Sequence, residues 1–345
     1  MREAVAGVAV LFVMCGVPAR ADAQGKGANL ASEAACQSLT PTSMGGPSPK
    51  SRDVMVWRWL GASNHELAYR NSVILMNAYY QRTPPARPLG FSRDDVKKAN
   101  AIYVGHAHGD HIADAPYVAG RTGAPVIGAP ITTEQARKMG LPAAQAITVS
   151  GHGGEVQKYD GFTVEAVLAR HKNDPPELNR ATGAAFRSIM ESVHLARTPE
   201  QLAQAREQNQ GSNDPRITEE GVIGFLVTFD NGFTLLFRDG SGAATEDEKR
   251  LMQRLGGRTD VAVVAYTTYV PDVQIPNTMA LVKLFHPDVY MPTHHDDTGG
   301  GRLDTPIYPF AMALRDELPS ARTISPLYRT PVCFDTKTKN VFVGR

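Results

Sequence analysis

The sequence has almost no charge imbalance and no long apolar segment. Its 36 Lys and Arg residues and 35 Asp and Glu residues give a formal net charge of +1. A protein that binds nucleic acid needs a basic stripe, and none is found, so we expect no nucleic-acid partner. Runs of about 18 or more apolar residues are also missing, so no segment of the mature protein is predicted to span a membrane.

The N-terminus has the pattern of a segment that is removed during export. Arg2 supplies a positive charge, residues 4–17 form an apolar run, and A-x-A-like cleavage patterns follow at 19–21 and 21–23. A buried helix of the folded domain is the disfavoured alternative. Residues 1–23 are therefore predicted to be a secretory signal peptide, and the mature protein is predicted to be secreted into a bacterial periplasm.

Cysteine is scarce: there are three, and Cys15 lies in the predicted signal peptide. Cys36 and Cys333 lie near opposite ends of the mature chain. In an oxidising compartment they can form a disulfide, which would stabilise the fold by about 5 kcal/mol at most. Two unrelated free thiols are the alternative. Neither cysteine is close in sequence to the histidine cluster described below, so a thiolate metal site is not expected.

What is present is an ordinary globular composition, 42% hydrophobic and 21% charged over 345 residues. Residues 24–53, rich in Gly, Ser, Pro and Ala, are predicted to be an irregular entry segment. Strands are predicted at 54–61, 72–80, 101–106, 162–171, 261–266 and 288–294, and as a hairpin over 221–240 that turns at Asn231-Gly232. Helices are predicted over 92–100, from Thr132 or Thr133 to Gly140, from Thr245 to near Gly256, and after Asn277.

Residues 172–220 interrupt this mixture of strands and helices. They contain no convincing strand but two helical stretches, 181–196 and 199–209. The second has a strong start signal, with Thr198 as the cap and Pro199 at the first helical position. We interpret the segment as a helical insertion that packs over one end of the sheet.

The stretch GHAHGDHIAD (105–114) crowds three of the ten histidines and two aspartates into a short loop. Such side chains gain nothing from crowding unless they share a ligand, and a metal ion is the obvious one. His106, His108, Asp110 and His111 are therefore the first candidate ligands. A solvated polar loop is the disfavoured alternative.

Three more candidates each follow a predicted strand: His171, Asp239 and His294. Because strand ends meet at one edge of a sheet, two ligand sets can assemble there. The sets are His106, His108 and His171, and Asp110, His111 and His294, with Asp239 able to bridge them. Imidazole and carboxylate ligands suit zinc, and also iron or manganese.

The stretch HAHGDH resembles the H-x-H-x-D-H motif of the metallo-β-lactamase fold superfamily, and the three downstream candidates follow in that family's order. The resemblance covers residues 54–300. In detail the chain is similar to the ascorbate-6-phosphate-lactonase-like branch, through WLGASNHELAYRNSVILMNAYY, Asp114 and the MPTHHD ending. The family implies an α/β fold, a four-layer αββα sandwich, and we expect residues 54–345 to form it with the metal site at one edge.

The family also implies the chemistry. Two zinc ions about 3.5–4 Å apart, or Mn²⁺ or Fe²⁺ in their place, share a hydroxide that attacks a carbonyl, while Asp110 orients this nucleophile and passes on its proton. The resemblance thus implies an exported hydrolase of a small-molecule ester or lactone, with the helical insertion shaping the substrate pocket. A phosphodiesterase or a β-lactam hydrolase is the alternative within the fold, and a non-catalytic periplasmic metal-binding protein is the alternative from another class. A homo-oligomer is compatible with the sequence.

Two positions depart from the family's pattern. Asn77 stands where relatives usually have Asp, which would leave one carboxylate fewer to support the site. Arg238 stands where Gly is usual, which would put a cation beside Asp239. Both are expected to lower metal affinity or to shift the pKa of the hydroxide.

Four other residues are candidates for supporting or substrate-facing roles: His65, His194, Tyr269 and His295. A structural role is the alternative for His65, a helix-surface role for His194, a core role for Tyr269 and a surface role for His295. His294 is preferred to its neighbour as a ligand by the P-x-H match. His152 is the nearby rival of His171 and is interpreted as a loop residue.

Overall fold

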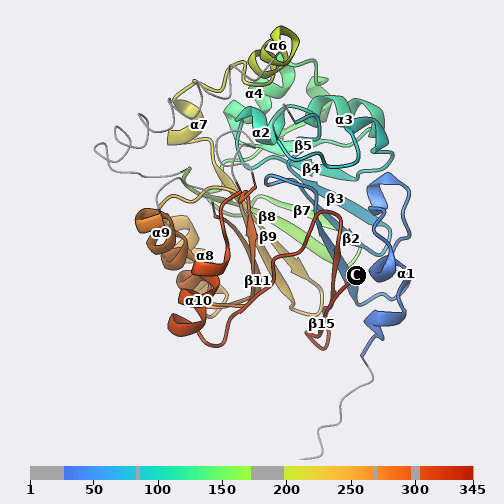
Figure 1. Ribbon diagram of the computed structural model, residues 1–345, viewed down its shortest axis with the longest axis vertical. Coiled ribbons are helices and arrows are strands. Elements are labelled where there is room, and N and C mark those ends of the chain that lie inside the picture. The colour runs from blue at the N-terminus through green and yellow to red at the C-terminus, as the bar shows by residue number, and fades with distance from the viewer. Residues whose placement is uncertain (1–26, 83–85, 172–197, 267–270, 297–303, 345) are drawn as a thin grey trace, which may run out of the picture.

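In the part of the chain that the computed structural model describes, residues 27–82, 86–171, 198–266, 271–296 and 304–344, two β-sheets pack face to face and helices cover both outer faces (Figure 1). This is the four-layer αββα arrangement predicted for the chain. None of the described helices is both long enough and apolar enough to cross a membrane.

Both sheets combine parallel and antiparallel strands. Within the described residues the first sheet has eight strands, in the order β15 (Val341–Val343), β14 (Pro331–Asp335), β1 (Val54–Trp59), β2 (His65–Tyr69), β3 (Ser72–Met76), β4 (Ala101–Tyr103), β5 (Val126–Gly128) and β6 (Ala146–Thr148). The second, described over the same ranges, has seven: β13 (Arg322–Thr323), β12 (Pro287–Thr293), β11 (Thr259–Ala265), β10 (Thr234–Arg238), β9 (Ile223–Phe229), β8 (Phe162–Leu168) and β7 (Val156–Tyr159). β3 to β6 run parallel, as do β10 to β13, so the carboxyl ends of the strands in each group lie at the same edge.

The hairpin predicted over 221–240 is confirmed. β9 and β10 pair antiparallel, with Thr228 opposite Thr234. Gly232 in the turn has a φ of +85°, which glycine adopts without strain. The side-chain oxygen of Asn231 accepts a hydrogen bond from the amide of Phe233 at 3.2 Å. The hairpin thereby brings Asp239, directly after β10, to the same edge as the ends of β11 and β12.

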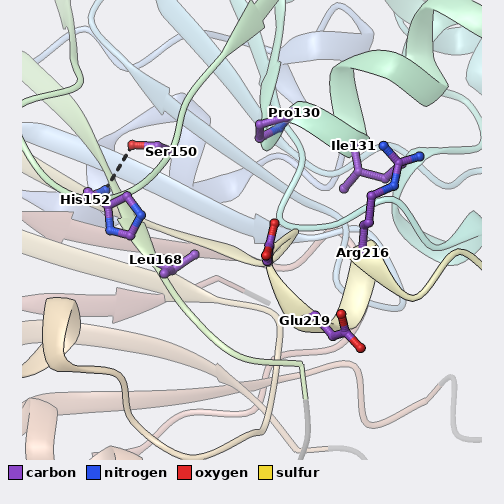
Figure 2. Close-up of a pocket in the computed structure, with 8 residues that line it drawn as sticks. Pro130, Ile131, Ser150, His152, Leu168, Arg216 and Glu219 are labelled. Carbon is purple, nitrogen blue, oxygen red and sulfur yellow. Dashed lines mark hydrogen bonds between the residues drawn. The ribbon is translucent and has the colours of Figure 1, made fainter.

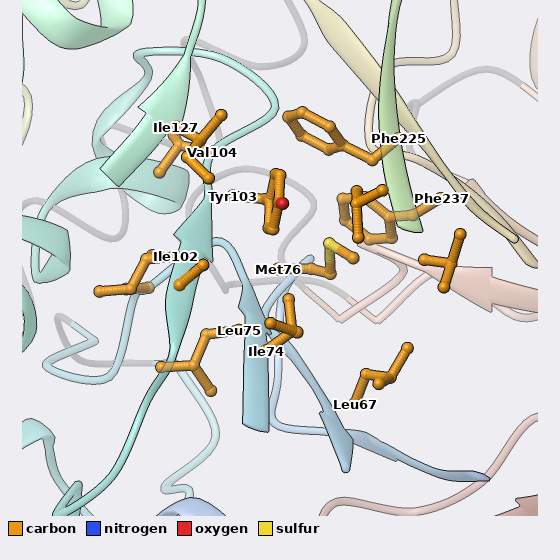
Figure 3. Packing of buried hydrophobic residues seen from close by; sticks show 14 of the residues in the cluster. Leu67, Ile74, Leu75, Met76, Ile102, Tyr103, Val104, Ile127, Phe225 and Phe237 are labelled. Carbon is orange, nitrogen blue, oxygen red and sulfur yellow. The ribbon is translucent and has the colours of Figure 1, made fainter. Parts of the chain in front are cut away.

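The main hydrophobic core lies between the two sheets, where side chains from both inner faces interlock (Figure 3). Leu67 and Met76 from the first sheet face Phe225 and Phe237 from the second. Fully burying a large apolar side chain contributes about 1.5–3 kcal/mol, so this layer is the main source of stability. The strands are therefore a rigid support for whatever lies at their ends.

Helices complete the outer layers. On the first sheet, α3 (Ala115–Thr122) and α4 (Pro130–Lys138) pack on β4, β5 and β6. On the second sheet, α8 (Glu246–Arg254), α9 (Pro271–Phe285) and α10 (Tyr308–Glu317) enclose a second hydrophobic cluster (Figure 1). Helix α8 begins as predicted, because Thr245 and Glu248 form a reciprocal capping box.

The entry segment is more ordered than predicted. Its described part contains short helical turns, namely Leu30–Ser32, α1 (Ala34–Gln37) and Thr42–Met44. Arg58 on β1 and Glu66 on β2 form a fully buried ion pair at 3.0 Å beneath it. Glu66 also accepts hydrogen bonds from the amides of Thr42 and Ser43, at 2.9 and 2.7 Å. These side-chain partners lie far apart in sequence, which is why local composition alone indicated an irregular segment.

The insertion is described from residue 198 onward. Helix α6 (Pro199–Gln208) has the predicted cap, in which Thr198 accepts a hydrogen bond from the amide of Gln201 at 3.3 Å. A further short helix, α7 (Arg216–Glu219), was not predicted. The helix predicted over 181–196 lies outside the described residues.

Several element boundaries differ from the prediction for identifiable reasons. The strand predicted to reach residue 80 ends at Met76, because Asn77 has a φ of +63°. The helix predicted over 92–100 is one turn, Arg93–Asp95, because the amides of Lys97 and Lys98 bond to the carbonyl of Ser43 instead. α4 begins at Pro130 and α9 at Pro271, with Pro276 inside α9. β2 was missed because its sequence, HELAY, does not alternate polar and apolar residues, although all five side chains are buried.

A disulfide joins Cys36 in α1 to Cys333 in β14, with the two Cα atoms 6.0 Å apart. The bridge, whose cysteines are separated by 297 positions in sequence, ties the entry segment to the C-terminal strands, where β14 also packs against α1 and β15 against the turn Leu30–Ser32. Covalent closure of so long a loop restricts the unfolded chain more than the folded one.

We predict that replacing both cysteines, Cys36→Ser with Cys333→Ser, lowers the free energy of unfolding by up to about 5 kcal/mol. Urea denaturation followed by circular dichroism measures this, and the reduced wild-type protein should reproduce the value of the variant. If the denatured, non-reduced wild type reacts with a thiol reagent at both positions, the bridge is absent from the protein.

Candidate metal centre

The seven candidate ligands lie at one edge of the sandwich, just beyond the ends of strands. His106 and His108 follow β4, and Asp110 and His111 lie in the short helix α2 (Gly109–Ile112). The others follow β8, β10 and β12, all in the second sheet, and they are His171, Asp239 and His294. Strand ends from both sheets therefore contribute to one site.

Potential ligand atoms gather there in overlapping groups. Among the described residues, the side chains of His106, His108 and His171 form one group whose ligand atoms lie within 4.8 Å of one another. A second such group contains Asp110, His111 and His294. These are the two sets expected from the sequence. A third group, His106, His111 and Asp239, connects them.

The atoms within these groups are arranged as a metal ion would require. The Nε2 atom of His106 is buried and has no hydrogen-bond partner among the residues described. The Nε2 atoms of His111 and His294 lie 3.2 Å apart, and His294 Nε2 is 3.0 Å from a carboxylate oxygen of Asp110. Leaving a buried ring nitrogen unpaired is costly, and a cation would satisfy these lone pairs together. The residues therefore fit bound metal.

Asp239 lies between the two sets and contacts one imidazole of each. Its carboxylate oxygens lie 3.2 Å from Nδ1 of His106 and 2.9 Å from Nδ1 of His111. A proton on Nδ1 leaves the Nε2 of the same ring as the basic atom, so this carboxylate fixes the tautomer that a metal needs. In this geometry Asp239 supports both sets, and its expected role as a bridging ligand stays a prediction.

Asn77 supports Asp239 rather than leaving it without a partner. The amide nitrogen of Asn77 donates to Asp239 Oδ2 at 2.9 Å, and its amide oxygen accepts from the amide of Gly105 at 2.9 Å. An aspartate at this position would place a second negative charge against Asp239, whereas the asparagine supplies a donor. The carboxylate expected to be missing at position 77 is therefore replaced by an amide that donates a hydrogen bond to Asp239.

The expectation that Arg238 puts a cation beside Asp239 is wrong. Arg238 is fully buried and points away from the site, with its Nε 2.5 Å from a carboxylate oxygen of Glu248 in α8. Its Nη2 also donates to the carbonyl oxygen of Gly242 at 2.9 Å. Successive strand residues face opposite sides of a sheet, so Asp239 turns toward the site when Arg238 turns toward the helices.

Burial and charge prepare these side chains for binding a cation. Burial, reinforced by the neighbouring His106, lowers the pKa of His108 to about 3, and burial together with His111 lowers that of His106. Burial alone would raise the pKa values of the carboxyl groups of Asp110 and Asp239. Their imidazole neighbours outweigh this and hold both pKa values well below the usual range. Near pH 7 His106 and His108 are thus neutral, and Asp110 and Asp239 are ionised.

The four supporting candidates have different positions. His65 lies under the site, 2.7 Å from the hydroxyl of Thr293 and beside the ring of Trp57, in keeping with its structural alternative. His295 is stacked on Trp59, with ring centroids 4.3 Å apart, and is only 8% exposed, so a surface role is wrong. Tyr269 and His194 lie outside the described residues.

Ser63 and Asp114 act at the site in ways that sequence reasoning did not assign. The hydroxyl of Ser63 is 2.8 Å from Nδ1 of His111. Asp114 accepts hydrogen bonds from the amides of Tyr80 and Gln81, at 2.6 and 2.9 Å, and so fastens the loop after β3 to the histidine segment. A lone serine in a loop carries no motif, whereas Asp114 was noticed as part of the extended histidine motif.

A separate cavity of about 590 Å³ opens between the end of β8 and the start of α4 (Figure 2). Its described lining contains none of the seven candidate ligands, and consists of Pro130, Ile131, Ser150, His152, Leu168, Arg216, Glu219 and Glu220. The Nδ1 atom of His152 is 3.3 Å from a carboxylate oxygen of Asp247. His152 is thus a loop residue of this cavity, as expected, and takes no part in the groups that contain His171.

We predict that Gly105→Ala disrupts the centre without removing a ligand. The added Cβ would lie 2.0 Å from Asp239 Oδ2, so Asp239 must move away from both imidazoles. Overpacking of this kind costs about 1–3 kcal/mol, measurable by urea denaturation, and metal content measured by mass spectrometry should fall with it. The control is Gly120→Ala in α3, where the added Cβ meets no atom within 4 Å. Equal metal content in the two variants would contradict the role given to Asp239.

Sequence comparisons agree with this geometry. The model of a family described as the beta-lactamase superfamily domain matches residues 73–295. A UPF0173 metal-dependent hydrolase of Cupriavidus necator is 31% identical over 147 residues, which are 41% of this chain and 50% of the relative. Another, of Brucella anthropi, is 30% identical over 115 residues, 33% of this chain and 47% of the relative. The chain thus spans about half the length of the curated relatives it matches.

Solved structures share the fold at low sequence identity. Igni18, a metallo hydrolase from the archaeon Ignicoccus hospitalis, is 16% identical with a TM-score of 0.54, over 81% of this chain and 98% of that one. An isothiocyanate hydrolase from Delia radicum gut bacteria is 12% identical with a TM-score of 0.52, over 79% and 96% of the two chains. The likeness to the ascorbate-6-phosphate-lactonase-like branch is not singled out and stays a prediction. Fold, ligand arrangement and family match agree, and the chain belongs to the metallo-β-lactamase fold superfamily.

Proposed function

We propose that the protein is a metal-dependent hydrolase that binds two divalent cations, with zinc as the first choice and Mn²⁺ or Fe²⁺ as alternatives. His106, His108 and His171 would hold one ion, and Asp110, His111 and His294 the other. The observation that carries the proposal is that each described set offers three protein side chains. Three protein ligands with an open position are typical of catalytic zinc, whereas structural zinc is usually closed by four. This favours an enzyme over a non-catalytic metal-binding protein.

When bound, the metal pair supplies the positive charge that activates a water molecule and polarises a carbonyl group. The protein's own residues orient the reaction. The side chain of Asp110 is 28% exposed, unlike the nearly inaccessible carboxylate of Asp239, so it can reach a bound water or substrate. Its oxygens lie 3.0 Å from His294 Nε2 and 3.7 Å from His111 Nε2. Asp110 is therefore placed to orient the attacking water and to transfer its proton to the leaving group.

The substrate that we propose is a small ester or lactone. The support for this is the resemblance to the lactonase-like branch in the histidine motif and in the segments that flank the site. The activities in the names of the relatives, metal-dependent hydrolase and isothiocyanate hydrolase, agree on hydrolysis but differ from one another in detail. We also propose export to the periplasm, which the N-terminal apolar run and the Cys36–Cys333 disulfide support.

We predict about two zinc ions per chain after dialysis of the purified mature protein against metal-free buffer, measured by mass spectrometry. His294→Ala should lose one ion and lower the rate of lactone hydrolysis by more than about 100-fold. This loss is larger than the roughly 10–100-fold loss expected when a residue that only orients a metal ligand is removed. Asp239→Ala should weaken both sets.

His152→Ala is the control and should keep both ions, because His152 belongs to the separate cavity. Wild-type protein with one ion or none would contradict the two-metal proposal. Full metal content and full activity in His294→Ala would show that this histidine is not a ligand.

A further inference from the structure

Two residues beside the metal centre have backbone conformations that side chains rarely adopt. Ala62, between β1 and β2, has a φ of +48°, and His294 has a φ of +63°. For residues other than glycine such conformations cost about 1–3 kcal/mol and persist only where the surroundings impose them. The contacts around these two residues therefore have to be strong.

A hydrogen bond joins the two strained residues to each other. The amide of His294 donates to the carbonyl oxygen of Ala62 at 3.0 Å. The same oxygen accepts from the indole nitrogen of Trp59 at 2.7 Å and from the hydroxyl of Thr293 at 3.2 Å. The turn between β1 and β2 is thus held to the end of β12, where His294 begins the loop.

Asp296 closes this arrangement from the other side. One of its carboxylate oxygens accepts from the amide of Ala62 at 2.9 Å. The other accepts from Nη1 of Arg82 at 2.7 Å and from the hydroxyl of Tyr328. The side chains of Asp296 and Arg82 are only 2% and 3% exposed, so solvent screens their interaction little.

We infer that Asp296 is a positioning residue, which holds His294 in the orientation that its metal set requires. Ala62 binds His294 through its carbonyl and Asp296 through its amide, so the segment from His294 to Asp296 is fixed at both ends. His295 between them is stacked on Trp59. The ring of His294 consequently reaches Asp110 and His111. The inference rests on the proposed function, because it concerns the affinity of the second cation.

The negative charge of Asp296 matters as well as its shape. An asparagine of the same size can accept only with one oxygen, so it cannot serve Ala62 and the Arg82–Tyr328 pair together. It would also remove the negative charge 2.7 Å from the buried guanidinium of Arg82, which is destabilising. Release of Ala62 would then allow both strained residues to relax, and His294 would swing away from Asp110.

The test is isothermal titration calorimetry, in which Zn²⁺ is added to protein from which a chelator has removed all metal. In Asp296→Asn the affinity of one of the two ions should fall by about 10–100-fold, the usual effect of removing a residue that orients a metal ligand, while the other is unchanged. Tyr328→Phe removes one hydrogen bond and is expected to fold normally. It should lower the affinity for the same ion by a smaller factor. Hydrogen exchange of the Ala62 and His294 amides in the metal-free protein should speed up in both variants.

Glu66→Gln is the matched control. Glu66 is also a buried carboxylate that binds one arginine and backbone amides, but its partners are Arg58, Thr42 and Ser43 in the entry segment. This variant should lose thermal stability as Asp296→Asn does, yet keep both zinc affinities. Equal loss of affinity in the two variants would reduce Asp296 to a general stabilising residue and overturn the inference.

The outcomes separate the inference from the proposed function. Wild-type protein that takes up fewer than two ions contradicts the two-metal function itself. If the wild type takes up two ions and Asp296→Asn retains both affinities, the function stands and the inference fails. Unchanged exchange of the Ala62 and His294 amides in Asp296→Asn would likewise overturn it.

Discussion

The carboxylate of Asp239 is the contact on which the organisation of the site depends. It comes from the second sheet, and it binds His106 and His111, which come from the first, along with Asn77. A single buried charge thus joins the edges of the two sheets, in addition to the apolar contacts between their inner faces. Its neighbour Arg238 is directed to the opposite face, where Glu248 neutralises it. Because successive side chains along a strand point to opposite faces of the sheet, the charges of Arg238 and Asp239 are kept apart although the two residues are adjacent.

The surroundings of the site are held rigidly, both by the apolar core and by buried polar contacts. The core between the sheets fixes the strands, but it cannot fix a loop that begins where a strand ends. That task falls to buried polar contacts: Asp114 holds the loop after β3, Asn77 holds Asp239, and Asp296 holds the turn at Ala62. Asn77, Ala62 and His294 all have positive φ angles, so the backbone is strained where geometry matters most.

The amino-acid sequence predicted the features that arise from local patterns. The hairpin at Asn231-Gly232 and the capped helix at Thr245 follow from periodicity, turn residues and capping residues, whereas the αββα layers were expected from the family resemblance of the HAHGDH motif. The cluster from His106 to His111 is a local motif, and the downstream candidates were found because each follows a strand. The pairing of Cys36 with Cys333 followed from cysteine scarcity in a chain predicted to be exported.

What could not be predicted depends on partners distant in the chain. The charge of Arg238 is neutralised by Glu248 in a helix, and the order in the entry segment is set by Glu66 beneath it. The support from Ser63 has no motif, because one serine in a loop resembles any other. The helix at Pro271 contains Pro276, which local rules take as a stop, yet its tertiary packing on β11 and β12 keeps it helical.

The link between Cys36 and Cys333 also determines how the molecule would respond to mechanical force. A pull applied between the two ends of the chain enters at Cys36 and leaves at Cys333, so the covalent bridge carries the load past the whole chain between them, a sequence separation of 297. The strands that present the histidines would feel almost no tension, even when the ends are stretched apart. Only reduction of the bridge would expose the sandwich, and the site at its edge, to an external pull.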